Sequence, residues 1–191
     1  MNNYDSTPAG ARGETKRISD VLGSGKAILL GMPGAFTPTC NDVHLPGYFK
    51  AAPELFSKGV STIALVTTND RFVNAQWQKS MEECMGVPEG SSPVVMVSDA
   101  RGDLAESLGL IAYLGKALGV RSKRFALVVE DGFVKYKAVD QGSDALENTS
   151  AERVLEFIED DEGLLDGILP DARLLAGLGG FLFILWFLDN F

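Results

Sequence analysis

One short connection, residues 33–40 (PGAFTPTC), constrains this chain more than any other stretch. It follows the apolar run 27–32, which is typical of a buried β-strand, and it precedes residues 41–45, which are typical of the start of a helix. Its two prolines and its glycine keep the connection out of both elements. Cys40 is therefore predicted to lie in the first turn of a helix, where unpaired main-chain N–H groups and the helix dipole stabilise a thiolate.

Two side chains close to Cys40 in the sequence bear on its chemistry. The Thr37 hydroxyl precedes the sulfur by three residues and could hydrogen-bond a small ligand beside it. His44 follows Cys40 at i+4, where it could serve as the base of a Cys–His nucleophile pair. The sequence shows no oxyanion motif and no third residue that would orient such a pair, so a pocket-lining or main-chain-anchoring role is favoured for His44. These residues predict a cysteine nucleophile that reacts as its anion.

The composition excludes several classes of function. The 191 residues, 46% of them hydrophobic, suit one globular domain with a sizeable core. The net charge of −9 argues against a nucleic-acid-binding surface. Two cysteines without a CxxC pair indicate reduced thiols in the cytoplasm or in another reducing intracellular compartment. One histidine and two cysteines are too few soft ligands for a structural zinc site, so neither a metal nor a cofactor is predicted.

Alternating strand and helix signals predict an α/β fold. Its expected form is a central mixed β-sheet with helices on its faces. Strands are predicted at residues 27–32, 60–66 and 93–98, and a hairpin at 125–129 and 133–136 across an Asp-Gly turn. Helices are predicted from residue 41 to 57 with an interruption at Leu-Pro-Gly 45–47, and at 71–85, 103–108 and 150–160. Residues 116–122 are expected to form an irregular link.

The second cysteine lies in the predicted helix 71–85, which Asp70 is placed to cap. The apolar positions of this helix fall on one face, and they are Val73, Trp77, Met81 and Cys84. Cys84 is therefore predicted to be a buried packing thiol.

The two ends of the chain differ in composition from its middle. Residues 1–14 are polar, without the apolar core of a signal peptide, and are expected to be flexible. Residues 15–162 are expected to form the folded domain, followed by an apolar tail, 163–191. Within this tail, the uncharged run 174–188 is shorter than the roughly 20 residues that span a bilayer. Three interpretations stay open: packing against the body or a second subunit, peripheral membrane association, or disorder.

A specific pattern surrounds Cys40. The P-x-x-x-T-x-x-C spacing of Pro33, Thr37 and Cys40 resembles the active-site signature of peroxiredoxins. With the residues HLPG at 44–47, the segment is similar to the type II, or peroxiredoxin 5-like, subfamily. Further matches lie at residues 68–70, 72–73, 77, 123–125, 128–129 and 131–134, so the likeness spans about residues 15–160.

The resemblance implies a thioredoxin-like fold and thiol-dependent reduction of hydrogen peroxide and organic hydroperoxides. It implies that Cys40 is the peroxidatic cysteine and that Pro33, Thr37 and Arg124 shape its pocket. We expect the Thr37 hydroxyl, the Cys40 main-chain N–H and the Arg124 guanidinium to stabilise the charge that moves from sulfur to the departing oxygen. Arg121 and Lys123 lie close enough in the sequence to exchange roles with Arg124.

The resemblance also raises the question of how the oxidised cysteine is reduced. Some relatives carry a resolving cysteine, but residues 140–150 contain none and Cys84 is the only other cysteine. We therefore expect an external thiol, such as glutathione, glutaredoxin or thioredoxin, to reduce Cys40. The resemblance implies a homodimer. The alternative function is a redox sensor or interaction protein that is oxidised at Cys40 with little turnover.

Overall fold

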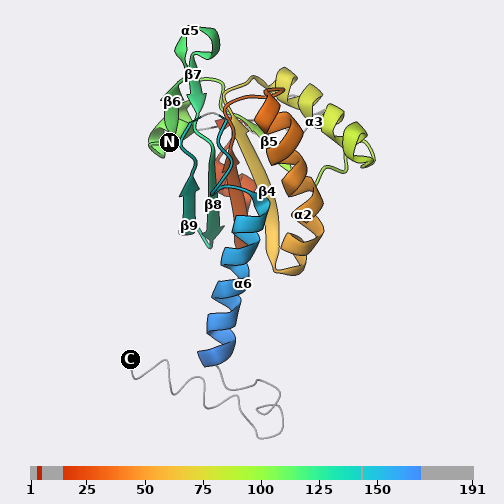
Figure 1. Cartoon of the computed structure of the whole chain (residues 1–191), viewed down its shortest axis with the longest axis vertical. Helices are drawn as coiled ribbons and strands as arrows, with labels where there is room; N and C mark the ends of the chain where they lie inside the picture. The colour runs from red at the N-terminus through yellow and green to blue at the C-terminus, as the bar shows by residue number, and fades with distance from the viewer. Residues whose placement is uncertain (1–3, 6–14, 143, 169–191) are drawn as a thin grey trace, which may run out of the picture. The chain divides into compact units, whose positions relative to one another are not determined.

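The computed structural model describes residues 4–5, 15–142 and 144–168, and the chain divides into two compact units, Met1–Leu155 and Glu156–Phe191. A seven-stranded β-sheet runs through the first unit in the order β2-β1-β5-β4-β3-β8-β9 (Figure 1). The pairs β3–β4 and β4–β5 are parallel and the other pairs are antiparallel, so the sheet is mixed as predicted. Its strands are β1 (Tyr4–Asp5), β2 (Thr15–Lys16), β3 (Lys26–Gly31), β4 (Val60–Thr67), β5 (Val95–Ser98), β8 (Phe125–Glu130) and β9 (Phe133–Val139).

Helices cover both faces of the sheet, because successive strand residues point to opposite faces. Ala27 and Leu29 of β3 belong to a core cluster that also contains residues of α1 (Ile18–Leu22) and α4 (Asp103–Ser107). The cluster comprises Leu22, Ala27, Leu29, Ala64, Val66, Val97, Leu104, Leu110, Phe125, Leu127 and Val129. The opposite face is covered by α2 (Leu45–Ser57) and α3 (Arg71–Met85), which lie on one side of the sheet in Figure 1 and contact β4 and β5.

The predicted strands are confirmed to within two residues at their ends. The predicted hairpin is confirmed as well, although its second strand runs to Val139, three residues beyond the predicted end. The hairpin turns at Asp131 and Gly132, whose φ angles of 50° and 84° are both positive. Positive φ at both central residues is what a type I′ turn requires, and Asp-Gly adopts it readily. The cap of α3 is confirmed too, since an Asp70 carboxylate oxygen accepts hydrogen bonds from the main-chain N–H groups of Phe72 and Val73.

The predicted interruption at Leu45-Pro46-Gly47 is wrong. The chain enters a π-helical turn at Cys40–His44 and continues directly into α2, which begins at Leu45. Pro46 lies in the first turn of α2, where the absence of an N–H costs little and the fixed φ of proline suits a helix.

Two segments expected to be irregular contain short elements. Residues 115–122 form α5 (Gly115–Leu118) and β7 (Val120–Ser122), and β7 pairs antiparallel with β6 (Ile111–Tyr113). The segment 1–14, expected to be flexible, contains β1, which pairs with β2 and with Ser98 of β5. Pairing over two or three residues depends on main-chain hydrogen bonds to a neighbouring strand, and so it leaves no periodic pattern in the side chains.

Cys84 is exposed, so its predicted burial is wrong. The buried side chains of α3 are Asn74, Trp77, Gln78, Met81 and Glu82. Three of these five side chains are polar, and their hydrogen bonds allow them to be buried. The buried face therefore keeps the predicted Trp77 and Met81 but includes polar residues in place of Val73 and Cys84.

The last helix, α6 (Ala151–Ile168), begins where predicted and extends beyond residue 160. Among the described parts of the chain, no helix is long and apolar enough to cross a membrane. The apolar run 174–188 lies outside the described residues, and its three interpretations stay predictions.

A substitution at Gly31 tests how closely β3 packs against the Phe125 and Ser122 side chains. A Cβ built on Gly31 would lie 2.0 Å from Phe125 Cε1 and 2.6 Å from Ser122 Oγ, so no side chain fits without movement of β8. We expect Gly31→Ala to lower the free energy of unfolding, measured by urea titration, by about 1–3 kcal/mol.

The control is Gly47→Ala in α2, where a Cβ would meet no atom within 4 Å. Because alanine is a better helix former than glycine, this change is expected to be neutral or to stabilise by about 0.5–1 kcal/mol. Equal stability of the Gly31→Ala variant and the wild type would contradict the described packing.

Candidate functional site

Main-chain pairing at one end of the sheet brings the predicted nucleophile segment beside Arg124. Strands β3 and β8 run antiparallel with Gly31 opposite Phe125. The chain leaves β3 after Gly31 on its way to Cys40, and it enters β8 at Phe125. The loop before Cys40 and the residue before β8, which is Arg124, therefore emerge at the same end of the sheet.

Cys40 is completely buried, with 0% of its surface exposed. Arg124 Nη2 donates a hydrogen bond to Cys40 Sγ over 3.4 Å, although the two residues lie 84 positions apart in sequence. Arg124 is also buried, at 1% exposed. A guanidinium remains cationic at any working pH, and its charge is weakly screened where water is excluded. It therefore favours the anionic form of the sulfur.

Arg124 is held by His44 as well. Arg124 Nη1 donates to His44 Nδ1 over 2.9 Å, and because a guanidinium has only donors, Nδ1 must be unprotonated. The proton of the neutral ring is then on Nε2, which donates to the Thr149 carbonyl oxygen over 2.9 Å. The pKa of His44 is lowered to about 4, chiefly because burial disfavours the charged ring and also because of the nearby charge of Arg124. Both ring nitrogens are engaged, so His44 is not the base of a Cys–His pair.

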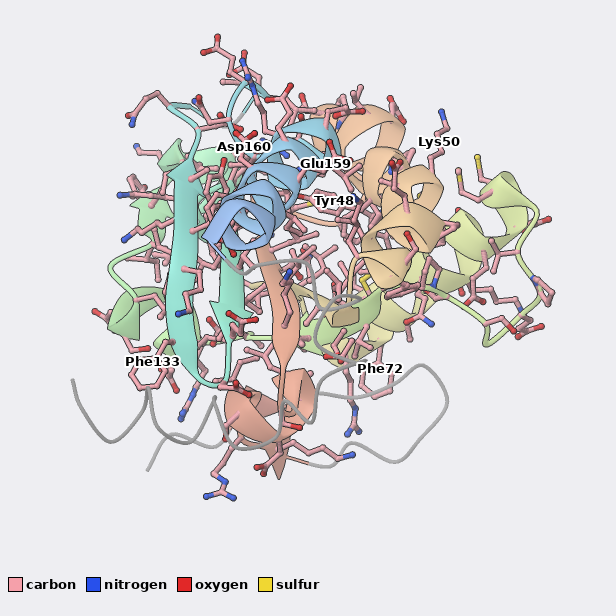
Figure 2. The ribbon with its side chains drawn as sticks, turned by 90° about the horizontal axis from the view of Figure 1, so that it is seen from below. Tyr48, Lys50, Phe72, Phe133, Glu159 and Asp160 are labelled. Carbon is pink, nitrogen blue, oxygen red and sulfur yellow. The ribbon has the colours of Figure 1, made fainter. Side chains whose placement is uncertain are left out.

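The Thr149 carbonyl oxygen receives a second buried donor. Tyr48 donates its hydroxyl hydrogen to that oxygen over 2.9 Å. Tyr48 is completely buried and projects from α2 toward the interior, whereas Lys50 on the same helix points outward (Figure 2). Two donors therefore fix the position of the Thr149 main chain. His44 lies in the turn just before α2, and Tyr48 lies within α2.

Asp140 anchors the same segment. Its carboxylate accepts hydrogen bonds from the Thr149 hydroxyl over 2.6 Å and from the Asn148 main-chain N–H over 2.7 Å. Burial by itself would raise the pKa of Asp140, but these hydrogen bonds and one from the Glu147 N–H lower it overall. The Asp140 N–H donates to the Arg124 carbonyl oxygen over 3.1 Å. Asp140 thus connects the Thr149 segment with the strand entry that carries Arg124.

The other two predicted residues lie in the loop before Cys40. Pro33 is buried and lines a cavity of about 130 Å³ together with Arg124. Thr37 Oγ1 donates to the Gly34 carbonyl oxygen over 2.9 Å. Because a hydroxyl has one hydrogen, this bond leaves the Thr37 oxygen free to accept a hydrogen bond from a ligand.

Several residues that shape this loop were not predicted as site residues. Asn69 Oδ1 accepts the Ala35 N–H over 2.9 Å, and Asn41 Oδ1 accepts the Trp77 Nε1–H over 2.8 Å. Phe36 has a positive φ of 60°, an uncommon conformation for an aromatic residue, and its ring lies 6.2 Å from that of Trp77. These contacts join distant segments, so no spacing in the sequence signals them. The same is true of Tyr48, Asp140 and Thr149.

The site contains a buried sulfur, a buried cation that donates to it and a hydroxyl oxygen oriented by the loop. Such a set suits an anionic nucleophile that attacks a small polar molecule, with the cation stabilising charge in the transition state. Among the described residues, no group of three or more His, Cys, Asp or Glu side chains could hold a metal ion.

Comparisons with known proteins identify the family of the chain. The family model described as Redoxin matches residues 5–155. Peroxiredoxin-2E-2, chloroplastic, of Oryza sativa subsp. japonica is 40% identical over 154 residues, which cover 79% of this chain and 65% of that protein. Peroxiredoxin-2B of Arabidopsis thaliana is 40% identical over 132 residues, which cover 69% of this chain and 77% of that protein. The chain spans only 65% of the rice protein and 60% of Peroxiredoxin-2E, chloroplastic, of Arabidopsis thaliana.

Solved structures give the same result. Reduced Prx3 in complex with H2O2 from Vibrio vulnificus is 30% identical with a TM-score of 0.72, and the match covers 83% of this chain and 94% of that one. Peroxiredoxin 5 from Alvinella pompejana is 25% identical with a TM-score of 0.65, covering 84% and 99%. The predicted thioredoxin-like fold is therefore confirmed. The chain belongs to the Redoxin family and, within it, to the type II, peroxiredoxin 5-like peroxiredoxins.

Proposed function

We propose that this chain is a thiol-dependent peroxidase that reduces hydrogen peroxide and organic hydroperoxides at Cys40. The observation that carries the proposal is the buried Arg124 guanidinium, which donates to Cys40 Sγ over 3.4 Å and to His44 Nδ1 over 2.9 Å. A permanent cation against a buried sulfur is an arrangement that activates a cysteine nucleophile. The activities named for the relatives support the same function.

In the oxidation step, the Cys40 thiolate attacks the terminal oxygen of the hydroperoxide. A sulfur–oxygen bond forms, the O–O bond breaks, and an alkoxide or hydroxide leaves and takes a proton from water. The sulfur becomes a sulfenic acid and the peroxide is reduced by two electrons. Arg124 and the Cys40 main-chain N–H stabilise the charge as it moves, and the Thr37 oxygen accepts the peroxide hydrogen and orients the molecule. Pro33 limits the access of water to the sulfur.

In the reduction step, an external thiol attacks the sulfenic sulfur, forms a mixed disulfide and releases water. A second thiol then attacks this disulfide and restores the Cys40 thiol. We propose glutathione, glutaredoxin or thioredoxin as the donor, in a reducing compartment. The absence of a cysteine from residues 140–150 supports an external donor.

The proposal extends to the architecture. We assign the catalytic domain to residues 15–162, a range that the Redoxin match over residues 5–155 supports. We also propose a homodimer. Large apolar side chains exposed close to the site support it, namely Phe36, Val43 and Phe72, of which Phe72 is 71% exposed (Figure 2). Sedimentation velocity measures the oligomeric state.

The two cysteines provide a matched pair of variants. Cys40→Ser is expected to abolish peroxide consumption in the presence of thiol donors, because serine is a poor nucleophile at neutral pH. Cys84→Ser is expected to keep the wild-type turnover, because an external thiol reduces Cys40. Turnover and the mass of each cysteine after oxidation are the measurements.

Three results would contradict this assignment. Peroxide consumption by Cys40→Ser would place the chemistry elsewhere, and loss of turnover in Cys84→Ser would assign the resolving role to Cys84. A wild-type protein that is oxidised once and then stalls with every donor would instead be the redox sensor.

Arg124 is tested with a variant that keeps its charge. Arg124→Lys retains one cation, but an ammonium lacks the planar fork that reaches Cys40 and His44 together. We expect the rate constant for oxidation by H2O2 to fall by about 10²–10³-fold, as for other lost transition-state donors. Circular dichroism of the variant controls for its fold, and an unchanged rate constant in a folded variant would exclude Arg124 from the reaction.

The pKa of the His44 ring can be measured directly by NMR, because His44 is the only histidine of the chain. Burial lowers its pKa to about 4, so its imidazole NMR signal is expected to titrate near pH 4, with 6.5 as the value for an unperturbed ring. The unfolded chain binds this proton below pH 6.5 and the folded chain does not, so stability falls as the pH drops from 6.5 to 4. The shift corresponds to about 3 kcal/mol. Titration near pH 6.5 would contradict a neutral ring bound to Arg124.

A further inference from the structure

One stretch of this acidic protein carries only positive charge. Between Glu106 and Glu130 there is no acidic residue, although the chain has 26 acidic and 17 basic side chains. The same stretch contains Lys116, Arg121, Lys123 and Arg124. It includes β6, α5 and β7, which Figure 1 shows at one end of the first unit. Arg124 is the buried cation beside the Cys40 sulfur, whereas Lys116, Arg121 and Lys123 have no part in the proposed reaction.

Arg121 lies against the loop that carries the nucleophile. Arg121 Nη1 is 3.3 Å from the point where a Cβ on Gly34 would stand, and Thr37 Cγ2 is 3.4 Å from the same point. The guanidinium therefore lies over Gly34, in space that the missing side chain of Gly34 leaves open, and Thr37 borders the same space. Arg121 Nε donates to the Leu118 carbonyl oxygen over 2.7 Å, which fixes the direction of the side chain.

The charge of Arg121 is available to a ligand. Within the described residues, no acidic side chain forms an ion pair with Arg121, and the side chain is only partly buried. Its neighbours in the same segment, Leu118 and Val120, are exposed and apolar, with 38% and 54% of their surface accessible. A cation flanked by apolar surface suits a molecule with an anionic group and a short hydrocarbon part.

We propose that Arg121 binds the carboxylate of anionic hydroperoxides and gives the enzyme a preference for them over uncharged ones. This inference rests on the proposed peroxidase function and adds a substrate class to it. A net charge of −9 would otherwise repel such substrates, and a cation close to the loop that carries Cys40 offsets that repulsion locally. The reaction at Cys40 is unchanged, because Arg121 pairs with the carboxylate of the substrate and takes no part in breaking the O–O bond.

The experiment compares two peroxides that differ only in charge. A short tertiary alkyl hydroperoxide bearing a carboxylate and its uncharged methyl ester are each mixed rapidly with the reduced protein, and Cys40 oxidation is followed in a single turnover. No reductant is present, so effects on a thiol donor do not enter. We expect Arg121→Gln to slow oxidation by the acid about fivefold, as for loss of a partly exposed ion pair, and oxidation by the ester less than twofold. The preference of the wild type for the acid is expected to weaken at high ionic strength.

Two controls separate this inference from its alternatives. Lys116→Gln removes an exposed cation of the same segment and is expected to change neither rate, and H2O2 reports whether the site of each variant is intact. Equal slowing of acid and ester by Arg121→Gln, or an equal effect of Lys116→Gln on the acid, would overturn the role of Arg121. Failure of the wild type to react with any peroxide, H2O2 included, would instead overturn the proposed function itself.

Discussion

The buried guanidinium of Arg124 is the constraint on which the rest of the site depends. A cation without partners in a protein interior is destabilising by several kcal/mol, so its N–H groups need acceptors. The Cys40 sulfur and the His44 ring nitrogen provide two of them. Protonation of His44 would replace an acceptor with a second positive charge. The imidazole must therefore stay neutral, and its burial achieves this.

The need for a neutral His44 ring accounts for the buried polar groups that hydrogen-bond around Thr149. A neutral imidazole with its proton on Nε2 needs an acceptor, which the Thr149 carbonyl provides. The position of that carbonyl depends in turn on Tyr48 and on the Asp140 carboxylate. The residues connected in this way come from both ends of the domain, so folding brings Cys40 and the groups that support Arg124 together. Removing His44 would leave an N–H of the buried Arg124 without its acceptor.

The sequence was sufficient where the determinants are local. Apolar β-branched runs identified the central strands, the Asp131-Gly132 step identified the hairpin, and the loop at residues 33–40 placed Cys40 in a helical turn after a buried strand. Prediction from the sequence failed where contacts between distant residues determine which side chains are buried or paired. The buried polar face of α3 left Cys84 exposed, contrary to its apolar pattern. The choice between Arg121 and Arg124 as the partner of the sulfur follows from the pairing of Gly31 with Phe125, and this register cannot be read from the chain before it folds.

The complete burial of Cys40 affects which step limits the rate of the proposed cycle. The terminal oxygens of a hydroperoxide are small enough to reach a buried sulfur, but a thiol carried by a tripeptide or a protein is too bulky to contact it there. The π-helical turn that begins at Cys40 would have to unwind before the second reactant arrives. At high peroxide concentration, the turnover rate would then be limited by the rate of that unwinding and not by the reaction at the sulfur.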